Sequence, residues 1–333
     1  MRPFSLTLLL ILTVACGAED AAPQLDADSG DVVSPDIEGI AVFFADSPRL
    51  SLGGVDATGP TQFSSVTDLV VTDDGGIWVV DSQSQEIRVF ASDGSHRFNV
   101  GGKGSGPGEY LSLRFLGAAP DGSVVAVDGA TRRVGRYDLS GELLETSTWD
   151  YASRVAPLGF TSDGSLVGIE QPAWPAAILE QGGVYEDTVA LLTWPDLDEP
   201  ADTVAELPGF VSVVSPDGTK RLPFSSMPAV AAEGMVLVSP GAEPEITLVQ
   251  GDSIERRIIV QRDPTSVARV RAEYRAFVEE RFDGEAAREQ LELLDHPAVP
   301  EYVSAYYQFV LNPDGHIWAQ RTPLGSPDES VWD

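Results

Sequence analysis

The chain of 333 residues has a single cysteine, Cys16, and only three histidines. One cysteine cannot form a disulfide within the chain, so a folded domain of about 300 residues must be held together by its core, which a chain of that length can bury. The histidines, His96, His296 and His316, share no metal-ligand spacing, which argues against a zinc site. No Gly-x-Ser-x-Gly motif occurs, so nucleophilic catalysis has no visible candidate.

Positive charge is also scarce. Lys and Arg total 21 against 52 Asp and Glu, which gives a formal net charge of -31, and only Lys103 and Lys220 are lysines. Such a charge argues against nucleic acid and anionic lipid headgroups as partners. We interpret the acidity as a solvated surface, with adaptation to a salt-rich habitat as the alternative.

The first sixteen residues have the pattern of an export signal. Arg2 supplies a short positive region, residues 6–12 are nearly all apolar, and small residues precede Cys16. The apolar run is too short to span a bilayer as a stable helix, so we expect a cleaved secretory signal over residues 1–16. From Gly17 onwards the chain is acidic and dotted with proline, which predicts a flexible tether over 17–37.

The residues before Cys16 resemble the box of bacterial lipoproteins, in which the cysteine becomes the lipid-bearing N-terminus. Thr13 departs from this pattern, because leucine usually stands three places before the cysteine. The resemblance implies lipidation of Cys16 and, since Gly17 follows rather than aspartate, anchoring at the outer membrane. Ordinary signal cleavage and a chance cysteine remain the alternatives.

A repeat of short apolar segments and glycine turns organises the rest of the chain, residues 38–333. The glycine-rich stretch 101–110 has a degenerate copy at 53–63, in which Phe63 stands 47 residues before Tyr110. Residues 74–81 match residues 121–128 at the same spacing. A fixed period of this length, built from short strands, is typical of a β-propeller.

Each unit is predicted to form four antiparallel strands, called A to D from the propeller axis outwards. Asp-Gly pairs mark the turns between strands A and B, where glycine tolerates positive φ. Helical spacing replaces the β pattern over 264–296 and predicts a small helical insertion. The predicted strands of the first unit are 66–71, 77–80, 86–90 and 97–100; the second unit covers 114–150, the third starts near 155 with an insertion at 171–186, the fourth has strands at 235–239, 246–250 and 254–260, and the last has strands at 306–311 and 317–320.

The two ends of the propeller domain complement each other. Residues 40–44 and 50–53 are predicted to be strands C and D without their A and B, and the last unit has only A and B. Direct pairing of these halves would give five blades and would hide the open sheet edges. Because the chain stops where a further strand should begin, we expect a C-terminal truncation and six blades in the intact protein.

The pattern Gly-x-Gly-x-Gly-Pro-Gly-Glu-aromatic, followed by Asp-Gly, a strand and Val-Asp, resembles the NHL repeat. The chain from about residue 39 to 333 resembles secreted bacterial six-bladed propellers related to NHL proteins, many of them lipoproteins, and the resemblance is specific over 63–145. It implies an all-β, six-bladed β-propeller. Glu86 stands where NHL repeats usually carry arginine, whereas the next unit has the expected arginine, Arg133, at this position. The family has no single activity that could be carried over.

The D–A and B–C loops of a propeller emerge on one face, where ligands usually bind. Every sizeable insertion of this chain falls on that face, as do both lysines. We therefore expect binding there of an anionic or sugar-like ligand or of an envelope protein, with the helical insertion as a partial cover. The alternative is that the insertions only fill and solvate the central channel and bind no ligand. The candidate ligand-binding residues are Lys103, Arg114, Trp174, Tyr185, Lys220 and Arg221.

Asp81, Asp128 and Glu170 end successive B strands at equivalent places. Propeller lactonases and related hydrolases, which the fold resembles, hold calcium with such acids. This predicts, as an alternative to a binding module without cofactor, a calcium-dependent hydrolase or lyase. Capping of turns by the repeated carboxylates is the interpretation that we favour, and a purely structural envelope scaffold is a third possibility.

Overall fold

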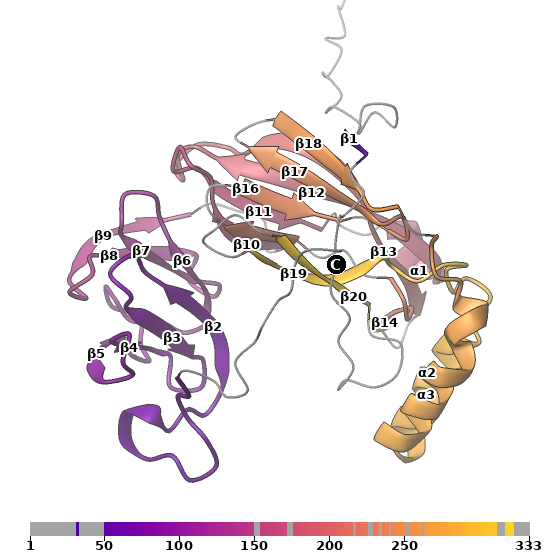
Figure 1. Ribbon diagram of the computed structural model, residues 1–333, viewed down its shortest axis with the longest axis horizontal. Helices are drawn as coiled ribbons and strands as arrows, with labels where there is room; N and C mark the ends of the chain where they lie inside the picture. Colours follow the sequence, from indigo (N-terminus) through magenta and orange to yellow (C-terminus); the bar gives the residue numbers. More distant parts are fainter. Residues whose placement is uncertain are drawn as a thin grey trace, which may run out of the picture.

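The computed structural model describes residues 31–32, 50–149, 154–171, 176–215, 218–225, 229–232, 235–239, 241–250, 253–261, 263–311 and 317–322. These residues form five sheets and three α-helices, arranged as radial blades (Figure 1). The predicted export signal with Cys16, the predicted strand 40–44, Trp174 and the C-terminal residues from 323 lie outside the described residues.

The first two blades repeat each other closely. Both are four-stranded antiparallel sheets in which the strands follow one another in chain order. Their central strands alternate little between buried and exposed, because neighbouring blades cover both faces. The strands are β2 (Val66–Val71), β3 (Ile77–Asp81), β4 (Glu86–Phe90) and β5 (His96–Gly101) in the first blade, and β6 (Leu113–Ala118), β7 (Val124–Asp128), β8 (Arg133–Tyr137) and β9 (Leu143–Thr148) in the second.

The later blades depart from this regular form. The third has two long strands of 12 and 14 residues, a short helix between its second and third strands, and an added outer strand. The last described sheet has two strands. The third blade contains β10 (Val155–Phe160), β11 (Leu166–Glu170), α1 (Ala176–Gln181), β12 (Gly183–Trp194), β13 (Asp202–Ser215) and β14 (Gly218–Arg221); the fourth contains β15 (Ala229–Ala232), β16 (Met235–Val238), β17 (Glu245–Gln250) and β18 (Ser253–Ile259); the fifth contains β19 (Tyr306–Leu311) and β20 (Ile317–Arg321).

Two segments outside the blades also have regular structure. The predicted helical insertion is confirmed as α2 (Val267–Arg281) and α3 (Gly284–Leu294), which form a helical hairpin. Within the predicted tether, β1 (Asp31–Val32) pairs in parallel with Ile258 and Ile259 of β18. The tether prediction did not anticipate this contact with the outer edge of the fourth blade.

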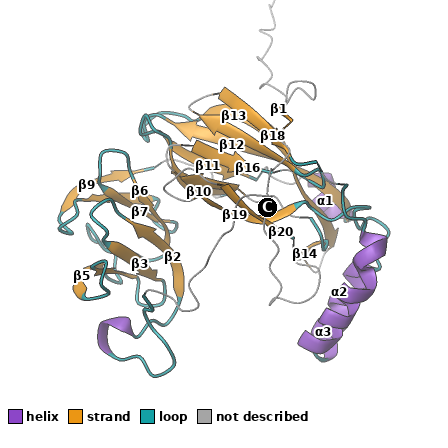
Figure 2. Ribbon diagram, in the orientation of Figure 1, coloured by secondary structure: helices purple, strands orange, loops and turns teal. Residues whose placement is uncertain are grey.

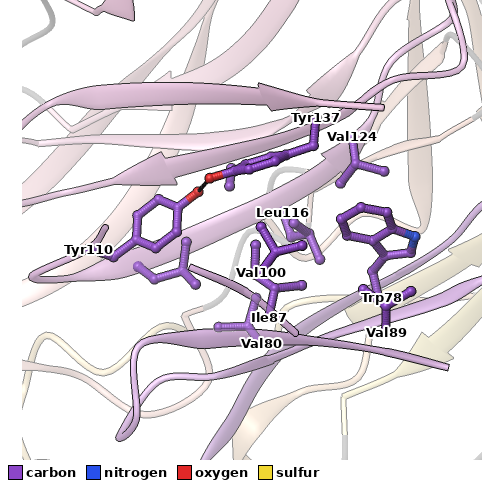
Figure 3. Close-up of a cluster of buried hydrophobic side chains, with 11 residues drawn as sticks. Trp78, Val80, Ile87, Val89, Val100, Tyr110, Leu116, Val124 and Tyr137 are labelled. Atoms are coloured by element: carbon purple, nitrogen blue, oxygen red, sulfur yellow. Dashed lines mark hydrogen bonds between the residues drawn. The ribbon is translucent and has the colours of Figure 1, made fainter. Parts of the chain in front are cut away.

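The blades pack through apolar clusters that lie between successive sheets. The innermost strands β2, β6, β10, β15 and β19 contact one another in that order. Between the first two blades, Trp78 and Val89 of one sheet and Val124 of the other are fully buried (Figure 3). Each blade therefore hides the flank of its neighbour, as the repeat predicts.

The segment Leu50–Gly53 is not a strand, contrary to the prediction. Its position nevertheless matches that of β5. A Cβ on Gly94 would lie 2.6 Å from Leu50 Cδ1, just as a Cβ on Gly141 in the second blade would lie 2.5 Å from Phe98 of β5. The segment thus takes the place of an outer strand in a blade that precedes the first.

Candidate functional site

The candidate face is the end of the propeller where the D–A and B–C connections emerge. We call it the insertion face and define it by the connections 102–112, 129–132, 171–182, 222–228 and 260–305. Because the inner strands of successive blades pack side by side, the antiparallel order within each blade places these connections at the same end.

The glycine-rich loop between the first two blades is a rigid linker. Gly101 and Gly102 have φ of 84° and 145°, which side chains rarely adopt. Arg133 donates from Nη2 to the Ser105 carbonyl at 2.9 Å and from Nη1 to the Gly106 carbonyl at 2.5 Å. The amide of Gly106 donates to Glu109 Oε2 at 2.7 Å, so the loop binds a carboxylate of its own. It is therefore not an open phosphate cradle.

The first blade uses a displaced arginine for the same task. Glu86 occupies the position equivalent to Arg133, but Arg88, two residues further along the same strand, donates from Nη1 to the carbonyls of Pro60 and Gln62 at 3.1 and 2.6 Å. Residues two apart in a strand point to the same side of the sheet, which makes the shift possible. Searching the whole strand face for an arginine would have found it.

Asp81 has its carboxylate fully engaged. Its side chain is completely buried and accepts hydrogen bonds from the amides of Ser64, Ser65 and Gln83 at 3.0, 3.1 and 3.3 Å. Arg88 Nη2 lies 2.9 Å from Oδ2. Burial acts to raise the pKa of Asp81, but these hydrogen bonds and the positive charge of Arg88 together lower it below its usual value.

Asp128 plays the same part in the second blade. Its buried carboxylate accepts hydrogen bonds from the amides of Leu111, Ser112, Ala130 and Thr131, the last two at 2.8 Å. Burial again acts to raise the pKa, and the four amides outweigh it, so the pKa of Asp128 is lowered. Both aspartates join the start of strand A to the B–C turn of the same blade.

The structure does not bring the predicted calcium ligands together. The carboxylate oxygens of Asp81 and Asp128 already accept hydrogen bonds from backbone amides. Glu170 is a half-buried residue at the end of β11. Within the described ranges, no group of three or more His, Cys, Asp or Glu side chains is placed to hold a metal ion. The residues therefore do not fit a calcium cage, and turn capping explains the two aspartates.

The third blade extends onto the insertion face. Strands β12 and β13 continue beyond the end of β11, and β14 adds to their edge. Tyr185, Ser212 and Arg221 lie opposite one another across these three strands. Arg221 Cζ lies 3.7 Å from the centroid of the Phe210 ring, a cation–π contact within the chain.

The helical hairpin packs against the connection that follows β14. Phe224 and Tyr274 of α2 meet edge to face with ring centroids 4.8 Å apart, and Lys220 Nζ lies 2.9 Å from Glu289 Oε1 of α3. At the base of the hairpin, Arg271 donates to the Leu294 carbonyl at 2.7 Å. Figure 2 shows the hairpin at the periphery, pointing away from the sheets, so it does not lie across the inner strands in this view.

Phe224 is held in an unusual backbone conformation. Its φ is 67°, which is rare for a bulky residue. Its carbonyl accepts hydrogen bonds from the amide and hydroxyl of Ser304 at 3.0 and 2.8 Å, and its ring is buried against the hairpin. These contacts stabilise the strained conformation and fix the hairpin base to the blades.

The predicted ligand-binding residues fall into two groups. Tyr185, Lys220 and Arg221 belong to the extension of the third blade, whereas Lys103 lies in the connection between the first two blades and Arg114 lies at the start of β6. Lys103 is exposed on the glycine-rich loop, and Arg114 Nε lies 3.3 Å from Ser112 Oγ. Lys220 and Arg221 contact groups of their own chain, which leaves less positive charge for an anionic ligand than the sequence predicted.

Residues 61–160 match a protein family described as a 6-bladed beta-propeller (DUF5128). The fold is a β-propeller, and its antiparallel blades are consistent with the six-bladed form. The predicted fold class is thereby confirmed. A comparison with characterised proteins by sequence finds no match. Among the described helices, none is both long and apolar enough to cross a membrane.

Many solved structures resemble the chain, and the following three do so at low identity. A putative exported protein from Bacteroides fragilis has 14% identity and a TM-score of 0.46, covering 82% of this chain and 69% of that one. A member of the DUF4221 family from Bacteroides vulgatus has 9% identity and a TM-score of 0.42, covering 81% and 74%. Virginiamycin B lyase from Staphylococcus aureus has 11% identity and a TM-score of 0.33, covering 59% and 70%.

Proposed function

We propose that this protein is an exported, lipid-anchored β-propeller that binds a partner protein through its insertion face and performs no chemistry of its own. The observation that carries the proposal is the helical hairpin α2–α3, which projects from the blades (Figure 1) and has aromatic side chains up to its free end. A projecting hairpin with an exposed aromatic end is suited to a protein surface.

The aromatic side chains form a continuous series along the hairpin. Tyr274 and Phe277 have ring centroids 6.1 Å apart, and Phe277 and Phe282 have centroids 6.4 Å apart. The series starts at buried Phe224 and ends at Phe282, which is 38% exposed at the tip. Aromatic residues anchored on a buried cluster are the typical energetic centre of protein interfaces.

Charges beside the hairpin favour a protein over a small anion. Lys220 is paired with Glu289 and Arg221 is stacked on Phe210. A small anionic ligand would have to compete with both contacts, whereas a protein can cover them as the polar rim around an aromatic centre. We therefore favour the protein partner among the ligands considered.

Export and anchoring rest on the N-terminal sequence. The apolar run before Cys16 and the small residues next to it support cleavage and lipidation at that cysteine. We expect Cys16→Ala to move the protein from the membrane fraction to the soluble fraction of its host, and to abolish labelling by a radioactive fatty acid. Labelling that persists in the variant would contradict lipidation at Cys16.

The partner-binding proposal is tested with a matched pair of surface variants. Phe282→Ser removes the exposed aromatic tip, and Leu144→Ser removes a side chain that is 56% exposed on β9 of the regular second blade. In envelope extracts made with mild detergent, native electrophoresis should show the wild type and L144S in a larger complex and F282S released from it. A complex that survives in F282S, or never exceeds the monomer in the wild type, would overturn the proposal.

A further inference from the structure

A cavity of about 180 Å³ lies between the second and third blades, at the end opposite to the insertion face. It opens beside the A–B turn at Gly164 and the C–D connection at 195–198 of the third blade. Its polar and aromatic lining residues are Arg136, Glu145, Ser147, Phe160, Trp194, Asp196 and Asp198.

The repeat shows that this cavity replaces an apolar contact. In the first blade, Val89 of β4 pairs with Phe98 of β5; Val89 is fully buried between the sheets, and Phe98 is half-buried against the same cluster. Figure 3 shows Val89 in this cluster. At the equivalent place in the second blade, Arg136 of β8 pairs with Glu145 of β9. An apolar pair packed against the inter-blade cluster has thus become a charged pair at the same register position.

The facing blade also differs. Gly141, in the C–D turn of the second blade, packs against Phe98 and fills the space between the first two blades. The third blade has a longer connection at 195–201 in place of this tight turn. Polar side chains on one wall and a wider turn on the other therefore keep open a space that the repeat normally fills.

The charges around the cavity are mainly negative. Arg136 Nη1 lies 3.0 Å from Asp121 Oδ2 and 2.7 Å from Ser123 Oγ, so its positive charge is already paired. Glu145, Asp196 and Asp198 add three carboxylates to the lining. Trp194, Leu166 and other apolar side chains form the inner wall. An apolar wall with a negative rim is the combination that attracts an organic cation.

We propose that this cavity binds a small organic cation, a primary ammonium carried on a short aromatic or aliphatic body. The body would displace water from Trp194 and Leu166, and the ammonium would lie among Glu145, Asp196 and Asp198. The cavity volume of about 180 Å³ is close to that of an engineered apolar cavity of ~150 Å³ that binds benzene, which sets the size class of the ligand near a single aromatic ring. The site is distinct from the helical hairpin and does not depend on the proposed protein partner.

Benzylamine is the first probe, with benzyl alcohol and benzoate as controls of equal shape and different charge. In calorimetric titrations of the folded protein at neutral pH, benzylamine should bind at least about tenfold more tightly than benzyl alcohol, and benzoate should not bind. Equal affinity for benzylamine and benzyl alcohol, or heat from none of the three, would overturn the proposal.

Variants locate the binding. Glu145→Gln keeps the shape of the side chain and should weaken benzylamine binding about tenfold, whereas Glu142→Gln removes one charge from an exposed residue of the same blade and should leave it unchanged. The double variant R136V/E145F restores the apolar pair of the first blade and should abolish binding. The circular dichroism spectrum reports folding, and the E145Q result holds if the double variant does not fold. Equal affinity of E145Q and E142Q for benzylamine would show that the ligand binds elsewhere and would contradict the proposal.

Discussion

The first two blades and the third show how one repeat can serve either as a frame or as a support for additions. In the first two, strands, turns and inter-blade contacts recur at the same register, down to the carboxylates of Asp81 and Asp128. The third keeps the inner strands but lengthens β12 and β13 and adds α1 and β14. Regular blades thus maintain the ring, and the additions provide surfaces that the ring does not need.

The largest difference between these regions is expected at the end of strand B. Asp128→Ala leaves four backbone amides without their acceptor in a buried site, so it should lower the free energy of unfolding by about 3 kcal/mol. Glu170→Ala, at the equivalent position of the third blade, should cost less than about 1 kcal/mol, since that side chain is half-buried and can be hydrated. Urea unfolding of both variants measures the difference.

Equal losses in the two variants would show that the third blade caps its turn as the second does. They would remove the distinction between a regular frame and a modified blade at this position.

Acid should weaken the first two blades through the buried carboxylates of Asp81 and Asp128. The pKa values of Asp81 and Asp128 are lowered in the folded state, so the stability they contribute is complete above the unfolded value of about 3.9 and is lost as the pH falls through the folded values. Each carboxylate contributes at most about 1.4 kcal/mol per pH unit within that window. Urea midpoints measured between pH 5 and pH 2.5 should fall, and the fall should be shallower in Asp128→Asn. A slope unchanged by that substitution would contradict the assignment.

A smaller effect is expected at the Tyr110–Tyr137 pair, whose hydroxyls lie 2.5 Å apart between the first two blades (Figure 3). Burial raises the pKa of both phenols, so both stay neutral and one donates to the other. Tyr137→Phe should cost about 1 kcal/mol in unfolding free energy, because Tyr110 loses its buried partner. Tyr307→Phe, at a residue 55% exposed, is the control and should cost nothing measurable. An equal effect in both would mean that the pair does not stabilise the blade contact.

The smallest effect is expected where the hairpin contacts the third blade. Lys220 and Glu289 are both exposed by more than a third, so their ion pair is screened by solvent. A double-mutant cycle with Lys220→Gln and Glu289→Gln should give a coupling of about 0.3 kcal/mol that vanishes in high salt. A coupling above about 1 kcal/mol would show that the hairpin depends on this contact more than on the Phe224–Tyr274 cluster.

The regular part of the fold could be predicted from the sequence because its period is visible in residue types. The Asp-Gly turns and the spacing of Phe63 and Tyr110 specify strands and blades before any coordinates are known. The displaced Arg88 could not be predicted by matching positions, because a strand offers the same side of the sheet at every second residue. A search of the whole strand face for an arginine is needed to find it.

The candidate site could be predicted only in outline. Topology placed the insertions on one face, but it could not show that Lys220 and Arg221 turn towards Glu289 and Phe210. Nor could helical spacing show where the hairpin points, since that depends on the buried conformation of Phe224. The cavity between the second and third blades emerges from the pairing of Arg136 with Glu145, which is a property of the sheet and not of either residue alone.

Photo-cross-linking in living cells tests most directly the claim that regular blades form the frame and the hairpin makes the contact. A photoreactive amino acid would replace Phe282 at the hairpin tip in one strain and Leu144 on β9 in another, both at exposed apolar positions. We predict a discrete cross-linked product of higher mass from position 282 and none from position 144. A product from position 144 alone, or the same product from both, would contradict the account.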